Sequence, residues 1–385
     1  MRIVMDYRPA LRDRSGVGEY VHQTARALVL QYPDDSLTLF TSSWKDRPES
    51  SVGSDCPGAR VSDHRVPVSV LNFAWHQLEW PPIELVTHRR YDLAFSPHPL
   101  LLPTRGAAQV VMVHDLDFLR HPERTEREIR RDYPRLAGPH ARRASRVVVP
   151  SQYTATEVID RLGVPCRRVL VCPPGAPEWR DPVSERVEKG GYVLFIGTLE
   201  PRKNVGGLLE AYGRLLARRP NVPNLVLAGR AGPEAQPWLD AIARAPFAGH
   251  VEYLGYVGEQ DRQRVYAGAR VLVLPSYEEG FGMPALEAMS LGIPVVATNR
   301  GALPELVRDA AMLIAPEDVD SIVTALDRVL TEDGLAANLV ARGLARARQF
   351  EWRQTVRAIH AAFEDAIDER AQQCRGAWRH GHGSP

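Results

Sequence analysis

Short apolar runs alternate with longer stretches of helical periodicity along most of the chain. In the first half, runs rich in Val, Ile and Leu predict strands at 3–5, 37–41, 93–96, 109–113, 147–149 and 169–171. In the second half, the same pattern predicts strands at 193–196, 225–228, 251–254, 271–274, 295–297 and 312–314. Apolar strands separated by helices are typical of a parallel sheet covered on both faces. The pattern therefore predicts an α/β protein.

Residues 172–191 separate the two series of strands. They lack periodicity and carry four prolines and paired glycines, as linkers do. A chain of 385 residues also exceeds what one hydrophobic core usually supports. We therefore expect two Rossmann-like parallel-sheet domains that face one another, with a site in the cleft at the carboxyl ends of their strands. The expected boundaries are 1–172 for the N-terminal domain, 173–190 for the linker, 191–350 for the C-terminal domain, 351–370 for a last amphipathic helix and 371–385 for a disordered tail.

Composition narrows the class of protein. The formal net charge is +1 and no Lys/Arg tract carries interleaved aromatic residues, which argues against nucleic-acid binding. The four cysteines show no CxxC spacing, so a reducing cytosol without structural zinc is the simplest interpretation. The chain enters a strand at once, which leaves no room for a signal peptide, and no apolar run reaches the ~18 residues of a membrane span. We expect a cytoplasmic protein, with peripheral contact at the inner face of the membrane as the alternative.

Residues 275–289 concentrate residue types typical of a ligand site, namely glutamates, glycines and a proline at a helix start, more than any other stretch of the chain. A loop with Gly280 and Gly282 joins the strand at 271–274 to a helix whose first position would be Pro284. Glycines in such a loop permit positive φ and let a ligand approach backbone N–H groups. The helix directs the positive end of its dipole at the same space. The loop is therefore suited to an anionic ligand.

Two carboxylates flank this loop. Glu279 precedes it, and Glu287 lies in the first helical turn, from where its side chain can reach back over the loop. Carboxylates beside backbone amides suit a ligand with both vicinal hydroxyls and phosphate, such as a nucleotide sugar. The alternative is a chance pair in which Glu287 only complements the helix dipole.

This string resembles the E-x7-E signature of family 4 of the retaining glycosyltransferases, through Pro-Ser, Glu-Gly-Phe-Gly, Pro and Leu-Glu-Ala. The resemblance spans nearly the whole chain and is strongest over 192–310. It implies a GT-B fold, in which the N-terminal domain binds the acceptor, the C-terminal domain binds the nucleotide sugar, and the last helix crosses back to the N-terminal domain. The resemblance implies that Gly280, Phe281 and Gly282 of the loop and Glu287 of the helix bind the donor, and that Glu279 is the catalytic carboxylate.

Two cations stand at the opening of the second domain. Arg202 and Lys203 directly precede Asn204, which would cap the helix that follows. Cations at a helix N-terminus oppose its dipole, so either they are solvated or an anionic ligand meets them. The string Gly-Thr-Leu-Glu-Pro-Arg-Lys-Asn is similar to a form found in family 4, which implies that Arg202 and Lys203 contact the departing diphosphate. Many members have Arg where this chain has Thr198, which makes the role of Arg202 less secure.

The first domain offers His114 at the end of a predicted strand. A histidine there is often only packed, but family members place one beside the transferred sugar, which implies a catalytic role. Asp115 and Asp117 also form a DxD, the metal–diphosphate motif of another glycosyltransferase fold. We discount it because Arg202, Lys203 and the helix ends already supply positive charge, and we expect no metal and no cofactor.

Two further positions are implied to contact the donor through their backbones. Gly16 lies in a Gly-x-Gly turn after the first strand, which lacks the third glycine of a dinucleotide fingerprint. The resemblance implies that its amide approaches the donor diphosphate. It also implies that the backbone near Val257 reads the nucleobase while Glu287 holds the ribose diol.

Residues 120–146 contain nine arginines against four acidic residues. Arg124, Arg127, Arg131 and Arg135 have helical spacing and would form one basic stripe, although Pro134 would interrupt the helix. The stripe is either solvated or in contact with an anionic membrane or a diphosphate-linked lipid acceptor.

The sequence thus predicts a metal-independent, retaining glycosyltransferase that moves a hexose from a nucleotide sugar to a saccharide or lipid-linked saccharide. Mannose from GDP-mannose is the first expectation, because close variants of the Gly-Thr-Leu-Glu-Pro-Arg-Lys-Asn string recur among mannosyltransferases of bacterial surface polysaccharides. A nucleotide-sugar 2-epimerase and a non-catalytic sugar-binding protein are the alternatives.

Overall fold

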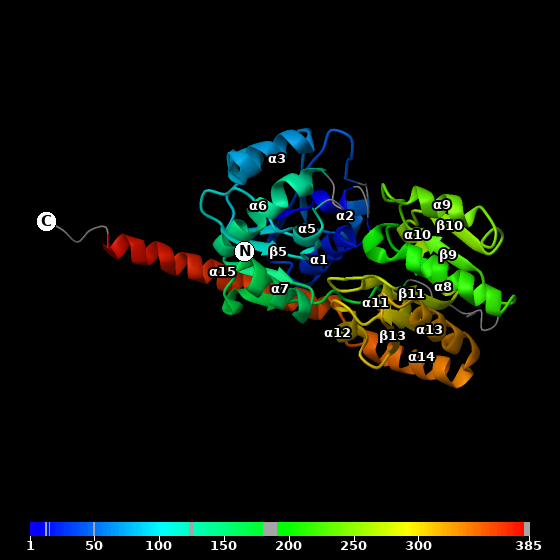
Figure 1. Cartoon of the computed structure of the whole chain (residues 1–385). Helices are drawn as coiled ribbons and strands as arrows, with labels where there is room; N and C mark the ends of the chain where they lie inside the picture. The colour runs from blue at the N-terminus through cyan, green and yellow to red at the C-terminus, as the bar shows by residue number, and fades with distance from the viewer. Residues whose placement is uncertain (12–13, 15, 49–50, 123–126, 180–190, 381–385) are drawn as a thin grey trace. The chain divides into compact units, whose positions relative to one another are not determined.

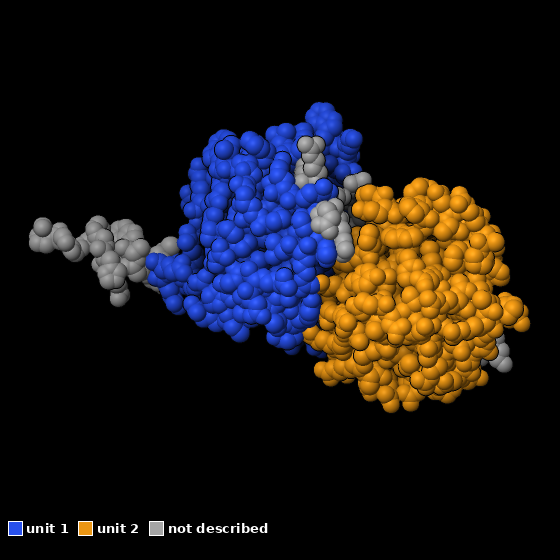
Figure 2. Space-filling model, viewed as in Figure 1, with its two compact units in different colours: residues 1–175, 352–385 blue, residues 176–351 orange. Residues whose placement is uncertain are grey.

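A computed structural model describes the chain except for residues 12–13, 15, 49–50, 123–126, 180–190 and 381–385. The chain divides into two compact units (Figure 2). Unit 1 comprises Met1–Gly175 and Trp352–Pro385, and unit 2 comprises Ala176–Glu351. Each unit is built on one parallel sheet, which confirms the predicted fold class.

The seven-stranded sheet of unit 1 has the order β3-β2-β1-β4-β5-β6-β7. Its strands are β1 (Arg2–Asp6), β2 (Ser36–Ser42), β3 (Arg60–His64), β4 (Leu93–Ser96), β5 (Ala108–Met112), β6 (Arg146–Val149) and β7 (Val169–Val171). The order of the strands reverses between β1 and β4. In open α/β sheets, ligands bind at the carboxyl ends of the strands beside such a topological switch point.

The edge strand β3 is absent from the sequence prediction. Its residues, Arg-Val-Ser-Asp-His, carry no apolar run, and their side chains are exposed or half-buried. The strand forms because β2 offers it a parallel partner, in the register Thr38 to Arg60 through Ser42 to His64. An edge strand needs only one buried face, so its sequence carries little signal.

Helices cover both faces of this sheet (Figure 1). They are α1 (Val17–Gln31), α2 (Ser51–Asp55), α3 (Val68–Gln77), α4 (Ile83–Thr87), α5 (Asp117–Arg120), α6 (Arg127–Arg143), α7 (Gln152–Leu162) and α15 (Trp352–His380). α15 follows unit 2 in the sequence but packs in the core of unit 1, where Val356, Ile359 and Phe363 are fully buried. The Phe363 ring lies 5.2 Å from that of Phe95 in β4.

The end of α15 corrects a prediction. A disordered tail was expected from residue 371, but the helix continues to His380. Residues 371–375 are mostly good helix formers, and no proline lies between residue 371 and Pro385, so the helix meets no proline there. The remaining predicted tail, 381–385, lies outside the described residues.

The six-stranded sheet of unit 2 has the order β10-β9-β8-β11-β12-β13, and its switch point lies between β8 and β11. Its strands are β8 (Tyr192–Ile196), β9 (Leu225–Ala228), β10 (Val251–Gly255), β11 (Ala269–Leu274), β12 (Val295–Thr298) and β13 (Ala311–Ile314). Its helices are α8 (Val205–Arg218), α9 (Gln236–Ile242), α10 (Glu259–Ala267), α11 (Met283–Ser290), α12 (Leu303–Val307), α13 (Val319–Thr331) and α14 (Asp333–Ala347).

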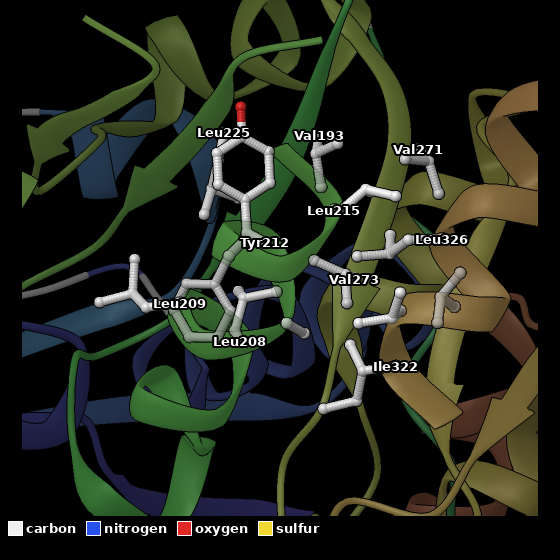
Figure 3. Packing of buried hydrophobic residues seen from close by; sticks show 14 of the residues in the cluster. Val193, Leu208, Leu209, Tyr212, Leu215, Leu225, Val271, Val273, Ile322 and Leu326 are labelled. Carbon is white, nitrogen blue, oxygen red and sulfur yellow. The ribbon is translucent and has the colours of Figure 1, made fainter. Parts of the chain in front are cut away.

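The largest core of unit 2 lies between its sheet and the helices α8 and α13 (Figure 3). Leu208 and Leu215 of α8 meet Ile322 and Leu326 of α13 there, each at most 1% exposed. Truncating one such leucine to alanine costs about 2–5 kcal/mol, because the neighbours relax only partly into the cavity. This core fixes the β8–α8 loop that carries the cations described below.

Unit 2 begins inside the segment predicted as a linker. Ala176 N donates to Phe350 O at 2.9 Å, and Trp179 Nε1 donates to Ser290 Oγ at 2.7 Å. Residues 176–179 therefore fold with unit 2, although prolines and glycines hide this in the sequence. Residues 180–190 of the predicted linker lie outside the described part of the chain.

Candidate active site

A buried ion pair spans the switch point of unit 2. Lys203 ends the short 3₁₀ helix Pro201–Lys203 after β8, and Glu279 lies in the loop after β11. Lys203 Nζ lies 2.6 and 2.8 Å from the two carboxylate oxygens of Glu279, and Ser276 Oγ donates to one of them at 2.7 Å. Burial raises the pKa of Glu279, but Lys203 and Arg202 outweigh it, so the net pKa is lowered. The structure thus joins two predicted site residues as a charged pair.

Arg202 ties the same two loops together. Its Nη1 donates to Glu278 O at 3.2 Å and lies 3.7 Å from Glu279 Oε2, while Tyr277 N donates to Arg202 O at 2.9 Å. Its Nε donates to Glu200 at 3.2 Å. The guanidinium therefore borders the Lys203–Glu279 pair.

Asn204 differs from its prediction as a side-chain cap. It precedes α8 but is left-handed, with φ 55°, and its amide donates to Pro275 O at 3.2 Å and Pro316 O at 2.7 Å. Both carbonyl groups belong to buried residues, where an acceptor without a partner is costly, and the side chain of Asn204 satisfies them instead of the helix start. Asn204 thus ties the β8–α8 loop to the β11–α11 loop.

Packing requires glycine at two positions, one at the end of the β11–α11 loop and one in the β12–α12 loop beside it. Gly282, at φ 102°, precedes α11, and a Cβ there would lie 2.4 Å from Leu303. Gly301, at φ 63°, leaves room for the backbone of Glu279, whose O a Cβ would approach to 2.7 Å. α11 begins at Met283, so Pro284 takes its second position rather than the first.

Phe281 is 9% exposed and its ring meets that of Phe350 edge-on at 5.8 Å. Its side chain thus belongs to the core of unit 2. The donor role that the motif implies for this residue would fall to its backbone, as it would for the neighbouring Gly280.

The second carboxylate, Glu287, is 3% exposed and is held by α10. Arg262 Nη1 donates to its Oε1 at 3.1 Å, and Tyr266 Oη donates to its Oε2 at 2.5 Å. Burial and the adjacent Glu287 raise the pKa of Tyr266 well above its usual value, so its hydroxyl stays a donor. Sequence reasoning missed both partners; their four-residue spacing on α10 was the only signal.

At the carboxyl ends of β8, β9 and β10, the backbones of the three chain segments lie in close contact with one another. Gly229, at φ 136°, follows β9, and a Cβ there would lie 2.0 Å from Gly197 O. Its N–H donates to Gly255 O at 2.7 Å. Val257, whose backbone is predicted to contact the nucleobase, lies two residues after Gly255 and is half-buried. A glycine at the end of β10 and one directly after each of β8 and β9 were the signal in the sequence for this close backbone approach.

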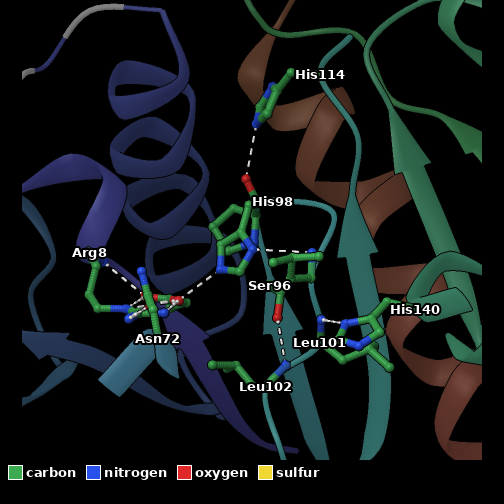
Figure 4. A network of polar contacts seen from close by, with 11 residues as sticks. Arg8, Asn72, Ser96, His98, Leu101, Leu102, His114 and His140 are labelled. Carbon is green, nitrogen blue, oxygen red and sulfur yellow. Dashed lines mark hydrogen bonds and ion pairs between the residues drawn. The ribbon is translucent and has the colours of Figure 1, made fainter. Parts of the chain in front are cut away.

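In unit 1, His114 follows β5 at the same edge of the sheet as the switch point (Figure 4). Its Nε2 donates to Pro97 O at 3.1 Å, and its ring meets Tyr20 edge-on at 5.4 Å. Burial lowers the pKa of His114 to about 4. The imidazole is therefore neutral near pH 7, with its proton on Nε2.

The switch point of unit 1 holds a cluster that the sequence prediction missed (Figure 4). The fully buried carboxylate of Asp6, at the end of β1, accepts from Arg8 Nη2 at 2.6 Å and His98 Nε2 at 2.9 Å. Leu100 N donates to His98 Nδ1 at 3.3 Å, so Nε2 carries the proton. Burial raises the pKa of Asp6, but Arg8 and His98 outweigh it and hold the pKa well below its usual range. Asp6 follows the apolar run of β1 directly, which was the available signal.

Gly16 directly precedes α1 at φ 52°, and a Cβ there would meet nothing within 4 Å. Its backbone is therefore open to approach. Asp115 Oδ1 accepts from Asp117 N at 3.1 Å at the start of α5. Among the described residues, no group of three or more His, Cys, Asp or Glu side chains is placed to hold a metal ion.

The predicted basic stripe is partly described. Arg124 lies outside the described residues, as does the side chain of Arg127. Arg131 donates twice to Asp132 at 2.8 Å, and Asp132 also accepts from His76 of α3 at 2.8 Å. Arg135 Nη2 donates to Gln77 of α3 at 2.8 Å.

The predicted interruption of the helix at Pro134 is wrong. α6 continues through both Pro134 and Pro139. Ala137 and Ala141 are fully buried in the core between α6 and the sheet, and this packing offsets the backbone hydrogen bonds that the prolines remove. No helix within the described part of the chain is both long and apolar enough to cross a bilayer.

Two parallel-sheet units, one of which carries paired cations, carboxylates and close-packed glycines at its switch point, have the architecture and charges that suit a phosphate-bearing ligand. Residues 14–180 match the model of Glycosyltransferase Family 4, and residues 178–346 match that of Glycosyl transferases group 1. O-antigen chain mannosyltransferase B of Escherichia coli is 32% identical over 381 residues, which cover 94% of this chain and 99% of that protein. The chain therefore belongs to glycosyltransferase family 4 and is a glycosyltransferase.

Solved structures show the same fold at low identity. WaaG, a glycosyltransferase involved in lipopolysaccharide biosynthesis, superposes with a TM-score of 0.71 at 16% identity, over 94% of this chain and 98% of that one. HepE from Anabaena, in complex with UDP and glucose, superposes with a TM-score of 0.70 at 19% identity, over 94% of this chain and 99% of that one. The predicted GT-B fold is thus confirmed.

Proposed function

We propose that this enzyme transfers mannose from GDP-mannose to a saccharide hydroxyl, with retention of configuration and without a metal, in the synthesis of a cell-surface polysaccharide or glycolipid. The observation that carries glycosyl transfer is the Lys203–Glu279 pair with Arg202 beside it at the switch point of unit 2. The choice of mannose is supported by the similarity to O-antigen chain mannosyltransferase B over almost the full length of both chains.

Catalysis would be mainly electrostatic. Lys203 is a compact charge and Arg202 a planar fork, so together they suit the phosphate oxygens of a departing diphosphate. Glu279 holds Lys203 through both oxygens. In this proposal it orients the ammonium group before the donor arrives and faces the transferred sugar. The leaving phosphate would take the acceptor proton, which makes a separate enzymic base unnecessary.

Donor recognition would use the rest of the edge of unit 2. Glu287, already fixed by Arg262 and Tyr266, would accept hydrogen bonds from the ribose diol. The backbone at Val257 would read the base, and the amides of Gly280 and Gly282 would approach the diphosphate beside the start of α11. In unit 1 the open backbone at Gly16 would meet the diphosphate, and neutral His114 would orient the sugar.

The proposed partner for the acceptor side is a saccharide or lipid-linked saccharide. A diphosphate-linked carrier at an anionic membrane would meet the predicted basic stripe, of which the side chains of Arg131 and Arg135 are described. This contact would be peripheral.

The anomeric configuration of the product, together with the effect of EDTA, tests the proposed function. Purified enzyme is incubated with GDP-mannose and a mannoside acceptor, and proton NMR follows the first product formed. We expect an α-linked mannoside and undiminished activity in EDTA. A β-linked product would contradict retention, and activity that EDTA abolishes and Mn²⁺ restores would contradict metal independence. Conversion of the donor without acceptor into its 2-epimer would show epimerisation instead.

A further inference from the structure

The outward face of α3 in unit 1 carries large apolar side chains that no core covers. Val70 and Phe73 lie about one helical turn apart and are 56% and 53% exposed. The chain continues this surface beyond the helix, because Leu78 and Trp80 are 62% and 61% exposed. Trp75, on the opposite face, is 1% exposed. We call Val70, Phe73, Leu78 and Trp80 the α3 ridge.

Hydrogen bonds fix the ridge in place. Leu78 N and Trp80 N both donate to Ala74 O, at 3.0 and 3.3 Å, so the chain folds back on the end of α3. Trp75 Nε1 donates to Pro81 O at 2.9 Å and anchors the same turn to the core. A contiguous apolar patch on an ordered element is rare on soluble proteins and marks a surface that binds something.

Arginines of α6 border the ridge. α6 lies against α3 (Figure 1). Arg135 Nη2 bonds to Gln77 at 2.8 Å, and Arg143 Nη2 bonds to Glu79 at 2.9 Å, so two arginines sit directly at the end of α3. α6 as a whole carries six arginines against two acidic residues. An aromatic and aliphatic ridge with a cationic border is therefore one continuous surface.

We infer that the α3 ridge and the α6 arginines dock unit 1 onto a bilayer with anionic headgroups. Trp and Phe side chains favour the boundary between headgroups and acyl chains, and guanidinium groups pair with lipid phosphates. The α3 ridge supplies the apolar contact with the acyl chains, and α6 supplies the positive charge. Either contribution alone would bind a membrane only weakly. This inference deepens the proposed function, because it places the enzyme where a lipid-linked acceptor would be.

A matched pair of leucines tests the apolar contact. Leu78 and Leu30 are 62% and 58% exposed, and Leu30 lies on α1, away from the ridge. The full-length protein is sedimented with phosphatidylcholine vesicles that contain or lack phosphatidylglycerol. We expect Leu78→Ser to weaken binding about tenfold, because a leucine loses its contact with the acyl region, and Leu30→Ser to bind like the wild type.

A matched pair of arginines tests the charge. Arg135→Gln should weaken binding about fivefold on vesicles with phosphatidylglycerol and little on those without it. Arg219→Gln, in unit 2, should have no effect. Thermal unfolding of each variant confirms that it is folded.

Mannosyl transfer to a soluble acceptor separates this inference from the proposed function. We expect Leu78→Ser to retain it fully while vesicle binding falls. Equal vesicle binding by Leu78→Ser and the wild type, or no binding by the wild type at all, would overturn the docking surface and leave the proposed activity untouched. A concentration-dependent dimer that Leu78→Ser dissociates would assign the ridge to a second copy of the chain instead.

Discussion

Lys203 and Glu279 hold one another with 15% and 10% of their side chains exposed. A buried ion pair contributes little net stability when both partners are present, but loss of one partner leaves a costly unpaired charge. The pair is therefore poorly explained as a stabilising device. It is better explained as a cation kept ready for an anionic ligand, with its geometry set in advance.

Replacing Lys203 or Glu279 should lower the turnover number more than it lowers the affinity for the donor. Lys203→Ala should lower turnover about 10²-fold or more, because one donor to the developing charge is lost. Glu279→Gln should lower turnover more than it lowers donor affinity, because Lys203 loses the group that orients it. Steady-state kinetics and donor titration by calorimetry measure both. Wild-type turnover in either variant would remove the proposed role of the pair.

Tyr266 should act on the donor through Glu287. Tyr266→Phe removes one hydrogen bond to the carboxylate and should weaken donor binding by about 1 kcal/mol, with a smaller effect on turnover. Tyr212→Phe is the control, since that hydroxyl donates to Pro223 O and His250 O in the core of the same unit. The loss in Tyr266→Phe should disappear with a 2′,3′-dideoxy donor. If the loss persists with that donor, Tyr266 has only a structural role.

At the scale of elements, the turn into α11 depends on a glycine. Gly282→Ala should cost about 2–4 kcal/mol, because the positive φ strains alanine and its Cβ would lie 2.4 Å from Leu303. Gly249→Ala is the matched control. Gly249 is also at positive φ, 82°, but a Cβ there meets nothing within 4 Å, so only about 1 kcal/mol is expected. Urea unfolding measures both, and equal losses would contradict the role of Leu303.

Elements with a strong periodic signal were predictable. Twelve apolar runs correspond to strands of the two sheets. The signal is strongest for strands such as β9 and β12, which are buried along their whole length and must be continuously apolar. The edge strand β3 and the continuation of α6 through Pro134 were not predictable, since tertiary contacts decide both. The same holds for the assignment of residues 176–179 to unit 2.

For the candidate site, the sequence supplied the charged residues but not their contacts. Glu279 and Lys203 are 76 positions apart, and only the parallel pairing of β8 with β11 brings their loops together. Arg262 and Tyr266 lie four residues apart on an ordinary polar helix, and this spacing places them on one face without indicating that they hold Glu287. The Asp6–His98 contact likewise needs the sheet order, because 92 positions separate its partners.

At the scale of the molecule, acid should weaken unit 1 before unit 2. Burial lowers the pKa of both His114 and His140 in unit 1 to about 4. A histidine with a depressed folded pKa stabilises the fold above its unfolded value, near 6.5, and this contribution is lost as the pH falls toward 4. The carboxylates with lowered pKa values, such as Glu279, lose theirs only below about 4.5.

We therefore expect unit 1 to lose about 2–4 kcal/mol between pH 7.5 and pH 5. Calorimetry at both pH values should show one of two unfolding transitions move to lower temperature. His140→Gln should reduce that movement, since it removes one of the two histidines. Transitions that shift equally, or not at all, would contradict the assignment of the acid sensitivity to unit 1.

The return of α15 to unit 1 sets an order of events at the ribosome. Unit 2 is one continuous stretch and can fold as soon as residue 351 has emerged. Unit 1 is synthesised first, yet Val356, Ile359 and Phe363, which complete its core, leave the tunnel only after the whole of unit 2. The apolar surface under α15 therefore stays open to water, and to chaperones, for the whole time that unit 2 is being translated. In this protein the domain that is made first is the one that is finished last.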